Sequence, residues 1–357
     1  MSAVFRALLA LALALTVPLA PAAQRRAPFA AQIATLSERP GYFDTDNLIS
    51  NERSYLQVLP DLQRRGGGGA YVGVGPDQNF SYIAAIRPSM AFIVDVRRDN
   101  MLLHLLFKAL FAESRTRVEY LAQLLGRPVP ADLQPSRTAP VDRLVAYVDG
   151  AAPLPAVADL RRRLDAAVAR TGVPLSAADR ATIDRFHRRF IADGLSLRFE
   201  STGRPPQSYN PTLRDLLRET DATGRQANYL AAEDAFQFVK RLQAEDLIVP
   251  VTGDLSGPTA IAAIGRLLAG RRESVSAFYV SNVEFYLFGA GRFPQFVANL
   301  ERLPRTRSTV LIRSVFGRFA ASTRAADASA SSLQPLDDLL REHAAGRIRS
   351  YADIASR

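Results

Sequence analysis

The chain has 357 residues, of which 48% are hydrophobic and 22% are charged, as in a soluble globular protein with one large or two modest domains. It contains no cysteine, which excludes disulfide bonds, thiolate zinc sites, iron–sulfur clusters and cysteine nucleophiles. Its three histidines are scattered along the sequence, so we predict no metal site.

The net charge of +10 is compatible with a nucleic-acid partner. However, every basic residue except Lys108 and Lys240 is an arginine, and many of the arginines alternate with acidic residues. This pattern favours solvated helix faces over a phosphate-binding surface. We therefore predict that nucleic acid is not a partner.

The first 22 residues have the pattern of a cleavable export signal. Arg6 supplies a positive charge, residues 7–19 are an apolar run, and Ala20 and Ala22 place small residues before a cleavage site. The run is shorter than the roughly 20 residues of a membrane span, so we expect no stable span after cleavage. These features predict a periplasmic or secreted protein. A mis-called start codon would instead imply a cytoplasmic one.

Residues 23–69 are predicted to form an extended lead-in and a short helix. After them, short apolar runs that end in glycine or polar residues predict strands, and apolar residues at helical spacing predict helices. The predicted strands cover residues 70–75, 91–96, 247–251, 275–280 and 308–313. The predicted helices cover residues 76–85, 100–125 and 226–244, a segment ending at residue 268, and residues 335–345.

This alternation predicts an α/β fold over residues 70–328, with a Rossmann-like, doubly wound and mainly parallel sheet. Residues 126–206 are rich in Pro, Ala and Arg and are predicted to form a helical insertion between the second and third strands. The insertion has helical patterns near residues 157–171 and 177–193. Residues 329–332 are predicted to be a flexible joint that opens a helical tail ending at residue 357.

Candidate site residues follow the predicted strands, because ligands of open parallel sheets bind at the carboxyl ends of the strands. The first predicted strand ends in Gly73 and Gly75, where missing side chains let a ligand approach the backbone and the next helix N-terminus. Asp95 ends the second strand, 20 residues beyond Gly75, where a carboxylate accepts hydrogen bonds from ribose hydroxyls. The alternative is that Asp95 pairs with Arg97 or Arg98.

The third and fourth strands are also followed by polar residues. Asp254 follows the third, where it could contact an adenine amine or cap the next helix. Asn282 and Glu284 follow the fourth strand, where such side chains can orient a substrate and accept its proton. Helix capping is the alternative for these two residues as well.

Taken together, the glycine turn at Gly73 and Gly75, Asp95, Asp254 and residues 281–284 resemble the Rossmann-like fold of S-adenosylmethionine-dependent methyltransferases. More narrowly, three runs look like an uncharacterised bacterial family of methyltransferase-like proteins: residues 49–52 (Ile-Ser-Asn-Glu), residues 71–80 and residues 92–98. The resemblance covers roughly residues 45–318.

The resemblance implies a site for S-adenosylmethionine or a related nucleoside, and a neighbouring site for an acceptor of unknown identity. The implied cofactor-binding residues are Gly73, Gly75, Asn79, Asp95 and Asp254, and the implied acceptor-aligning residues are Asn282 and Glu284. Two other functions stay open. One is an exported, non-catalytic protein that binds a ligand or partner with the same fold, and the other is a nicotinamide-dependent oxidoreductase.

Overall fold

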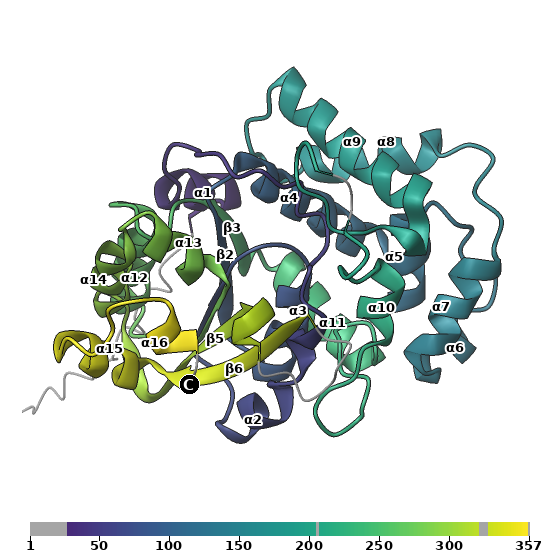
Figure 1. Cartoon of the computed structure of the whole chain (residues 1–357). Coiled ribbons are helices and arrows are strands. Elements are labelled where there is room, and N and C mark those ends of the chain that lie inside the picture. Colours follow the sequence, from purple (N-terminus) through teal and green to yellow (C-terminus); the bar gives the residue numbers. More distant parts are fainter. Residues whose placement is uncertain (1–26, 205–206, 321–327, 356–357) are drawn as a thin grey trace, which may run out of the picture.

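A six-stranded sheet between two layers of helices forms the centre of the molecule (Figure 1). The computed structural model describes residues 27–204, 207–320 and 328–355. The predicted export signal, residues 1–22, lies outside the described residues.

The strand order of the sheet is β3-β2-β1-β4-β5-β6. Neighbouring strands from β3 to β5 are parallel, and β6 pairs with β5 in the antiparallel direction. The strands are β1 Ala70–Gly73, β2 Met90–Asp95, β3 Ile248–Thr252, β4 Val275–Ser281, β5 Arg305–Phe316 and β6 Ser329–Pro335. The prediction of a mixed α/β fold with a mainly parallel sheet is confirmed.

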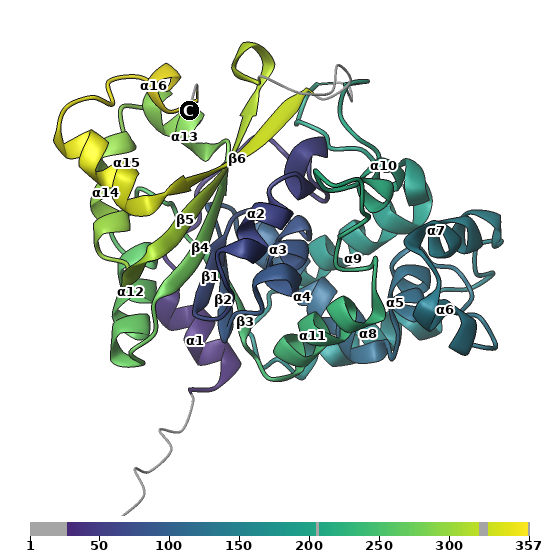
Figure 2. The same ribbon diagram turned by 90° about the horizontal axis from the view of Figure 1, so that it is seen from below.

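Helices cover both faces of the sheet. Figure 2 shows α12, α14 and α15 on one side and α2, α3, α4 and α11 on the other. Strand β1 in the middle of the sheet and strand β3 at its edge are both buried along their whole length, as continuous apolar runs in a sheet covered on both faces should be. The helices are α1 Phe29–Leu36, α2 Leu59–Arg64, α3 Gln78–Ile86, α4 Arg98–Glu113, α5 Arg117–Leu124, α6 Gln134–Thr138, α7 Val141–Gly150, α8 Ala158–Ala169, α9 Ala177–Asp193, α10 Leu213–Arg218, α11 Glu233–Ala244, α12 Ala260–Gly270, α13 Val283–Gly289, α14 Phe293–Glu301, α15 Leu336–Ala344 and α16 Ala352–Ala355, with 3-10 turns η1 Arg53–Leu56, η2 Gly194–Ser196 and η3 Gly317–Phe319. No helix in these ranges is both long and apolar enough to cross a membrane.

The segment predicted as a helical insertion contains α6 to α9 and lies between β2 and β3 in the chain. Helices α8 and α9 pack against α4, which itself covers β2 and β3. Figure 2 shows α5 to α9 gathered at one end of the molecule, away from β6. The insertion therefore extends the helical layer on one face of the sheet.

Two helix predictions differ from the structure. The lead-in is not wholly extended, since α1 forms there and packs against β3 and α12 through Phe29, Ile33 and Leu36. The predicted helix over residues 100–125 is two helices, α4 and α5. The break occurs at Thr116, whose hydroxyl caps α5 while the Glu119 carboxylate accepts a hydrogen bond from the Thr116 N–H.

The C-terminal joint predicted at residues 329–332 is instead part of strand β6. Pairing runs from Phe316 opposite Ser329 to Val310 opposite Pro335. The edge of β5 offers unpaired backbone groups that a neighbouring strand can satisfy. The Ser54 hydroxyl also hydrogen-bonds those of Ser329, at 2.8 Å, and Ser331, at 3.0 Å. These long-range contacts order a serine-rich segment that, by its composition, is typical of a linker.

We expect Thr116→Ala to lower the free energy of unfolding by about 1 kcal/mol, because the first turn of α5 loses its cap. Thr35→Ala is the matched control, since Thr35 is an exposed residue within α1. Its effect should stay within about 0.5 kcal/mol. Urea unfolding monitored by circular dichroism measures both values, and equal effects of the two substitutions would contradict the capping role.

Candidate functional site

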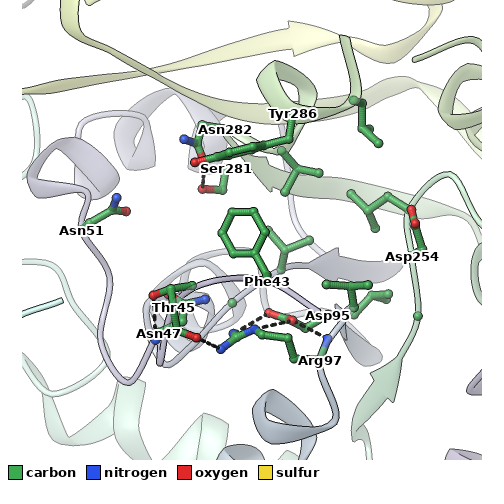
Figure 3. A pocket seen from close by; sticks show the side chains of 18 of the residues that line it. Phe43, Thr45, Asn47, Asn51, Asp95, Arg97, Asp254, Ser281, Asn282 and Tyr286 are labelled. Carbon is green, nitrogen blue, oxygen red and sulfur yellow. Dashed lines mark hydrogen bonds and ion pairs between the residues drawn. The ribbon is translucent and has the colours of Figure 1, made fainter. Parts of the chain in front are cut away.

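A cavity of about 350 Å³ lies where strands β1 to β4 end. It is lined by Gly75 after β1, Asp95 in β2, Gly253 after β3 and Ser281 in β4. A segment from the N-terminal lead-in closes another side, and Figure 3 shows Phe43, Thr45 and Asn47 of this segment around the cavity. The cavity is thus at the carboxyl edge of the parallel sheet, where the sequence predicted a site.

The two glycines at and just after the end of β1, Gly73 and Gly75, have different roles. Gly75 lines the cavity with a φ of 80°, a left-handed conformation that favours glycine. A Cβ at Gly75 would lie 3.2 Å from Gln78 Nε2 and 3.3 Å from Asn47 Nδ2, so a side chain would crowd the cavity wall. Gly73 does not line the cavity. A Cβ there would lie 2.0 Å from Asn79 Oδ1, so Gly73 makes room for Asn79 and not for a ligand.

Asn79 stabilises the turn from within. Its side chain is fully buried and does not line the cavity. The amide Nδ2 donates to the carbonyls of Val74, at 2.8 Å, and Pro76, at 2.7 Å, while Oδ1 accepts from the Tyr71 hydroxyl. The predicted ligand contact of Asn79 is therefore replaced by a positioning role for the backbone around Gly75.

A buried histidine, His104, also holds the turn at Gly75. His104 Nε2 lies 2.9 Å from the Gly75 carbonyl oxygen, to which it donates, and its ring packs edge-on against Phe80. Burial lowers the pKa of His104 to about 4, so the imidazole is neutral at physiological pH. The neutral ring holds Gly75 without placing a charge beside the cavity.

Asp95 lines the cavity and pairs with Arg97, as the sequence allowed. Its Oδ1 accepts from the Arg97 backbone N–H, at 2.9 Å, and from Nε, at 3.1 Å. Among the described residues, its Oδ2 accepts a hydrogen bond from Arg97 Nη2 alone, at 3.1 Å. A carboxylate oxygen has two lone pairs, so Oδ2 can still accept one hydrogen bond from a ligand. Arg97 also donates to the carbonyl of Thr45 and so ties the lead-in segment to β2 (Figure 3).

Asp254 also lines the cavity, on the side opposite Asn51 in Figure 3. Its Oδ1 accepts from the backbone N–H of Ser256, at 2.8 Å, and from the Ser256 hydroxyl. Its Oδ2 accepts from Arg292 Nη1 at 2.8 Å. These contacts hold the turn after β3 and do not cap the next helix, since the N-cap residue of α12 is Thr259. The partly exposed Asp254 carboxylate borders the cavity.

The two candidate site residues after β4, Asn282 and Glu284, lie in different surroundings. Asn282 lines the cavity, close to Ser281 and Tyr286 (Figure 3). Glu284 does not line it, because its side chain is fully buried and forms an ion pair with Arg313 of β5. Arg313 Nη2 donates to Glu284 Oε1 at 2.9 Å and to Gln334 Oε1 at 2.8 Å. Glu284 therefore joins α13 to β5 and β6 and does not line the cavity.

The sequence analysis did not select Glu52, a buried carboxylate that lines the cavity. Its Oε2 accepts from the hydroxyls of Tyr279, at 2.6 Å, and Ser314, at 2.5 Å, and its Oε1 accepts from Ser281. Burial raises the pKa of Glu52, and these three hydrogen bonds oppose the increase. The only sequence signal for it was its place in the run of residues 49–52.

Ser281 is the strained member of this group. Its φ of 53° is in the left-handed region, which is uncommon for a residue other than glycine. The strain turns the chain at the end of β4, and the Ser281 hydroxyl donates to Glu52. Strained backbone persists where surrounding contacts hold it, frequently at functional sites.

A comparison with protein-family models identifies the family of this chain. The model of a domain of unknown function, DUF7790, matches residues 47–127 and 187–352. The chain belongs to the DUF7790 family. A search of curated proteins found no match. The matched residues include β1 to β6 and every predicted site residue, whereas residues 128–186, with α6 to α8, lie outside the match.

We expect Glu284→Gln to lower the free energy of unfolding by roughly 3 kcal/mol, because it leaves the Arg313 charge buried and unpaired. Replacing both residues, as Glu284→Gln with Arg313→Met, should recover most of this loss. Urea unfolding of the two variants measures the difference. A single variant as stable as the unaltered protein would contradict the buried ion pair.

A second prediction concerns Asp77, which follows the glycine turn and accepts a hydrogen bond from the Tyr229 hydroxyl at 3.0 Å. Burial raises its pKa to about 6, above the unfolded value of 3.8. Its contribution to stability is thus fully present below pH 3.8 and is lost as pH rises through about 6. Asp77→Asn should gain roughly 1–3 kcal/mol relative to the unaltered protein between pH 4 and 7.

The opposing effect of His104, whose lowered pKa reduces stability as pH falls below 6.5, is present in both proteins and cancels in the difference. Chemical unfolding at several pH values measures this difference. A difference that stays constant from pH 4 to pH 7 would contradict the raised pKa of Asp77.

Proposed function

We propose that this DUF7790 protein binds a nucleoside-type ligand in the cavity, with S-adenosylmethionine as the first ligand to test, and that it is methyltransferase-like. The observation that carries this proposal is that Gly75 and Asp95 line one cavity at the carboxyl edge of the sheet. A glycine turn and an acid on the next strand are the two elements that such ligands require.

The sheet supports a Rossmann-like fold for β1 to β5. Strands β2 and β4 flank β1 on opposite sides, so the chain changes direction across the sheet at β1. Ligands of open α/β sheets bind outside the carboxyl ends of the strands at such a point. The antiparallel β6 differs from a fully parallel doubly wound sheet, and the proposal concerns the five parallel strands.

The cavity fits a ligand of this class. Its volume of about 350 Å³ is within the range of roughly 300–1,000 Å³ for small-molecule sites. Gly75 leaves space that a Cβ would fill, and Asp95 Oδ2 has a lone pair for a ribose hydroxyl. In addition, Gln78 Oε1 is buried beside the cavity and accepts no hydrogen bond from any described residue.

When bound, S-adenosylmethionine supplies an electrophilic methyl group on a sulfonium sulfur. Transfer requires mainly that the acceptor atom be held in line with that methyl group. Ser281 and Asn282 line the cavity at the end of β4 and are the residues that we propose to orient the acceptor. Glu284 has no part in this step.

We expect S-adenosylmethionine and S-adenosylhomocysteine to stabilise the purified protein more than NAD or ATP does. A ligand present at 100 times its dissociation constant adds about 2.7 kcal/mol of stability. Asp95→Asn should weaken nucleoside binding by about 1.5–3 kcal/mol, the contribution of one hydrogen bond to a charged group. Thermal shift and isothermal titration calorimetry measure both effects.

Asp61→Asn is the control for that substitution, since Asp61 is an exposed acid on α2 and does not line the cavity. Thermal melts without ligand show whether each variant is folded. Preferential stabilisation by NAD would favour the oxidoreductase alternative. Tight nucleoside binding without transfer to any acceptor in a screen would favour a non-catalytic binding protein.

A further inference from the structure

The charges that line the cavity do not balance. The lining includes three acids, Glu52, Asp95 and Asp254, and two bases, Arg97 and Arg292. Each base forms an ion pair with an acid, Arg97 with Asp95 and Arg292 with Asp254. Glu52 forms no ion pair with any Arg, Lys or His among the described residues. Glu52 is thus a lining acid that has no basic partner among the described residues.

The hydrogen bonds of Glu52 leave one acceptor position open. A carboxylate has about four lone-pair positions, and Tyr279, Ser281 and Ser314 fill three of them. Oε2 accepts two hydrogen bonds, from Tyr279 and Ser314, whereas among the described residues Oε1 accepts a hydrogen bond from Ser281 alone. The open position is therefore on Oε1, next to the strained Ser281 at the cavity wall.

The side-chain oxygen of Gln78, another residue that lines the cavity, is a second open acceptor. Its side chain is 6% exposed, and its Nε2 donates to the Tyr279 hydroxyl at 3.2 Å. The same Tyr279 hydroxyl donates to Glu52, so the two side chains are joined through one group. Because Gln78 Oε1 lacks a donor, this end of the cavity combines a carboxylate and an amide oxygen that need N–H or O–H partners.

Aromatic side chains line the same cavity. Phe43 and Tyr286 meet edge to face, with ring centroids 4.8 Å apart, and Tyr42 and Phe199 also line it. Aromatic faces attract organic cations at about 6 Å or less. An unpaired carboxylate together with such rings suits a positively charged group better than a neutral one.

We propose that Glu52 and Gln78 bind the protonated amine of an organic ligand, with the ammonium group donating to Glu52 Oε1 and Gln78 Oε1. A primary ammonium has three N–H donors and a positive charge, which match two open acceptors and one unbalanced carboxylate. The inference rests on the proposed function only in taking this cavity as the ligand site. It adds that ligands with an amine are selected over otherwise similar ligands without one.

The test compares the decarboxylated analogue of S-adenosylhomocysteine, which carries an ammonium group and no carboxylate, with methylthioadenosine, which has the same nucleoside and thioether without the ammonium group. Calorimetry on the full chain should show the amine-bearing nucleoside binding about 10- to 100-fold more tightly. In Glu52→Gln this preference should fall to within about threefold, while methylthioadenosine affinity is kept. Gln78→Met, which keeps the shape and removes the acceptor, should reduce the preference in part.

Glu301→Gln is the matched control, because Glu301 is exposed at the end of α14 and does not line the cavity. It should keep the full preference. Thermal melts verify that each variant is folded. Equal affinity for the two nucleosides in the unaltered protein, or a preference that survives Glu52→Gln, would overturn the amine site and leave the nucleoside proposal intact.

A second pair of probes applies if neither nucleoside binds, a result that would overturn the proposed function. These probes are 2-phenylethylamine and 2-phenylethanol, which differ in the amine and share an aromatic ring. Ligand-observed NMR should then show binding of the amine alone, and loss of that binding in Glu52→Gln. If the amine does not bind, or if both probes bind equally, the amine site is wrong.

Discussion

Because strands β1 to β5 run in one direction and helices cover both faces, the segments that follow these strands emerge at one edge of the sheet. The cavity forms at that edge, and one part of its wall consists of residues at or just after the ends of β1 to β4. Side chains 180 or more positions apart in the sequence, such as Asp95 and Ser281, therefore face one space. Parallel pairing is the constraint on which the position of every site residue depends.

The lead-in segment completes this edge and is held there by polar contacts. Arg97 donates to the carbonyl of Thr45, and Glu52 accepts hydroxyl hydrogen bonds from β4 and β5. Glu38 accepts from the backbone N–H groups of Asp254 and Thr259 and so ties the chain before the cavity to the turn after β3. These buried contacts satisfy groups that would otherwise be costly to remove from water. They also give the cavity a side that the sheet alone does not provide.

Arginine pairing determines which acids at the cavity edge lack a basic partner. Asp254 is held by Arg292, Asp95 by Arg97 and Glu284 by Arg313, so most of the carboxylates at this edge are neutralised within the protein. The Glu52 carboxylate accepts hydrogen bonds from hydroxyl groups and forms no ion pair with a described basic residue. The basic composition of the chain therefore says little about the cavity, because the arginines nearest to it are engaged.

The sequence by itself determined strands β1 to β5, the mainly parallel sheet and the edge at which Gly75, Asp95 and Asn282 line a cavity. Apolar runs and glycine turns are local signals, and they were sufficient for these elements. Only the tertiary structure decided the roles of Glu52, Glu284 and the serines of β6. Glu284 pairs with a residue 29 positions away, and Glu52 with residues more than 200 positions away. Whether an acid faces a ligand or an arginine depends on such distant partners, and local sequence patterns carry no information about them.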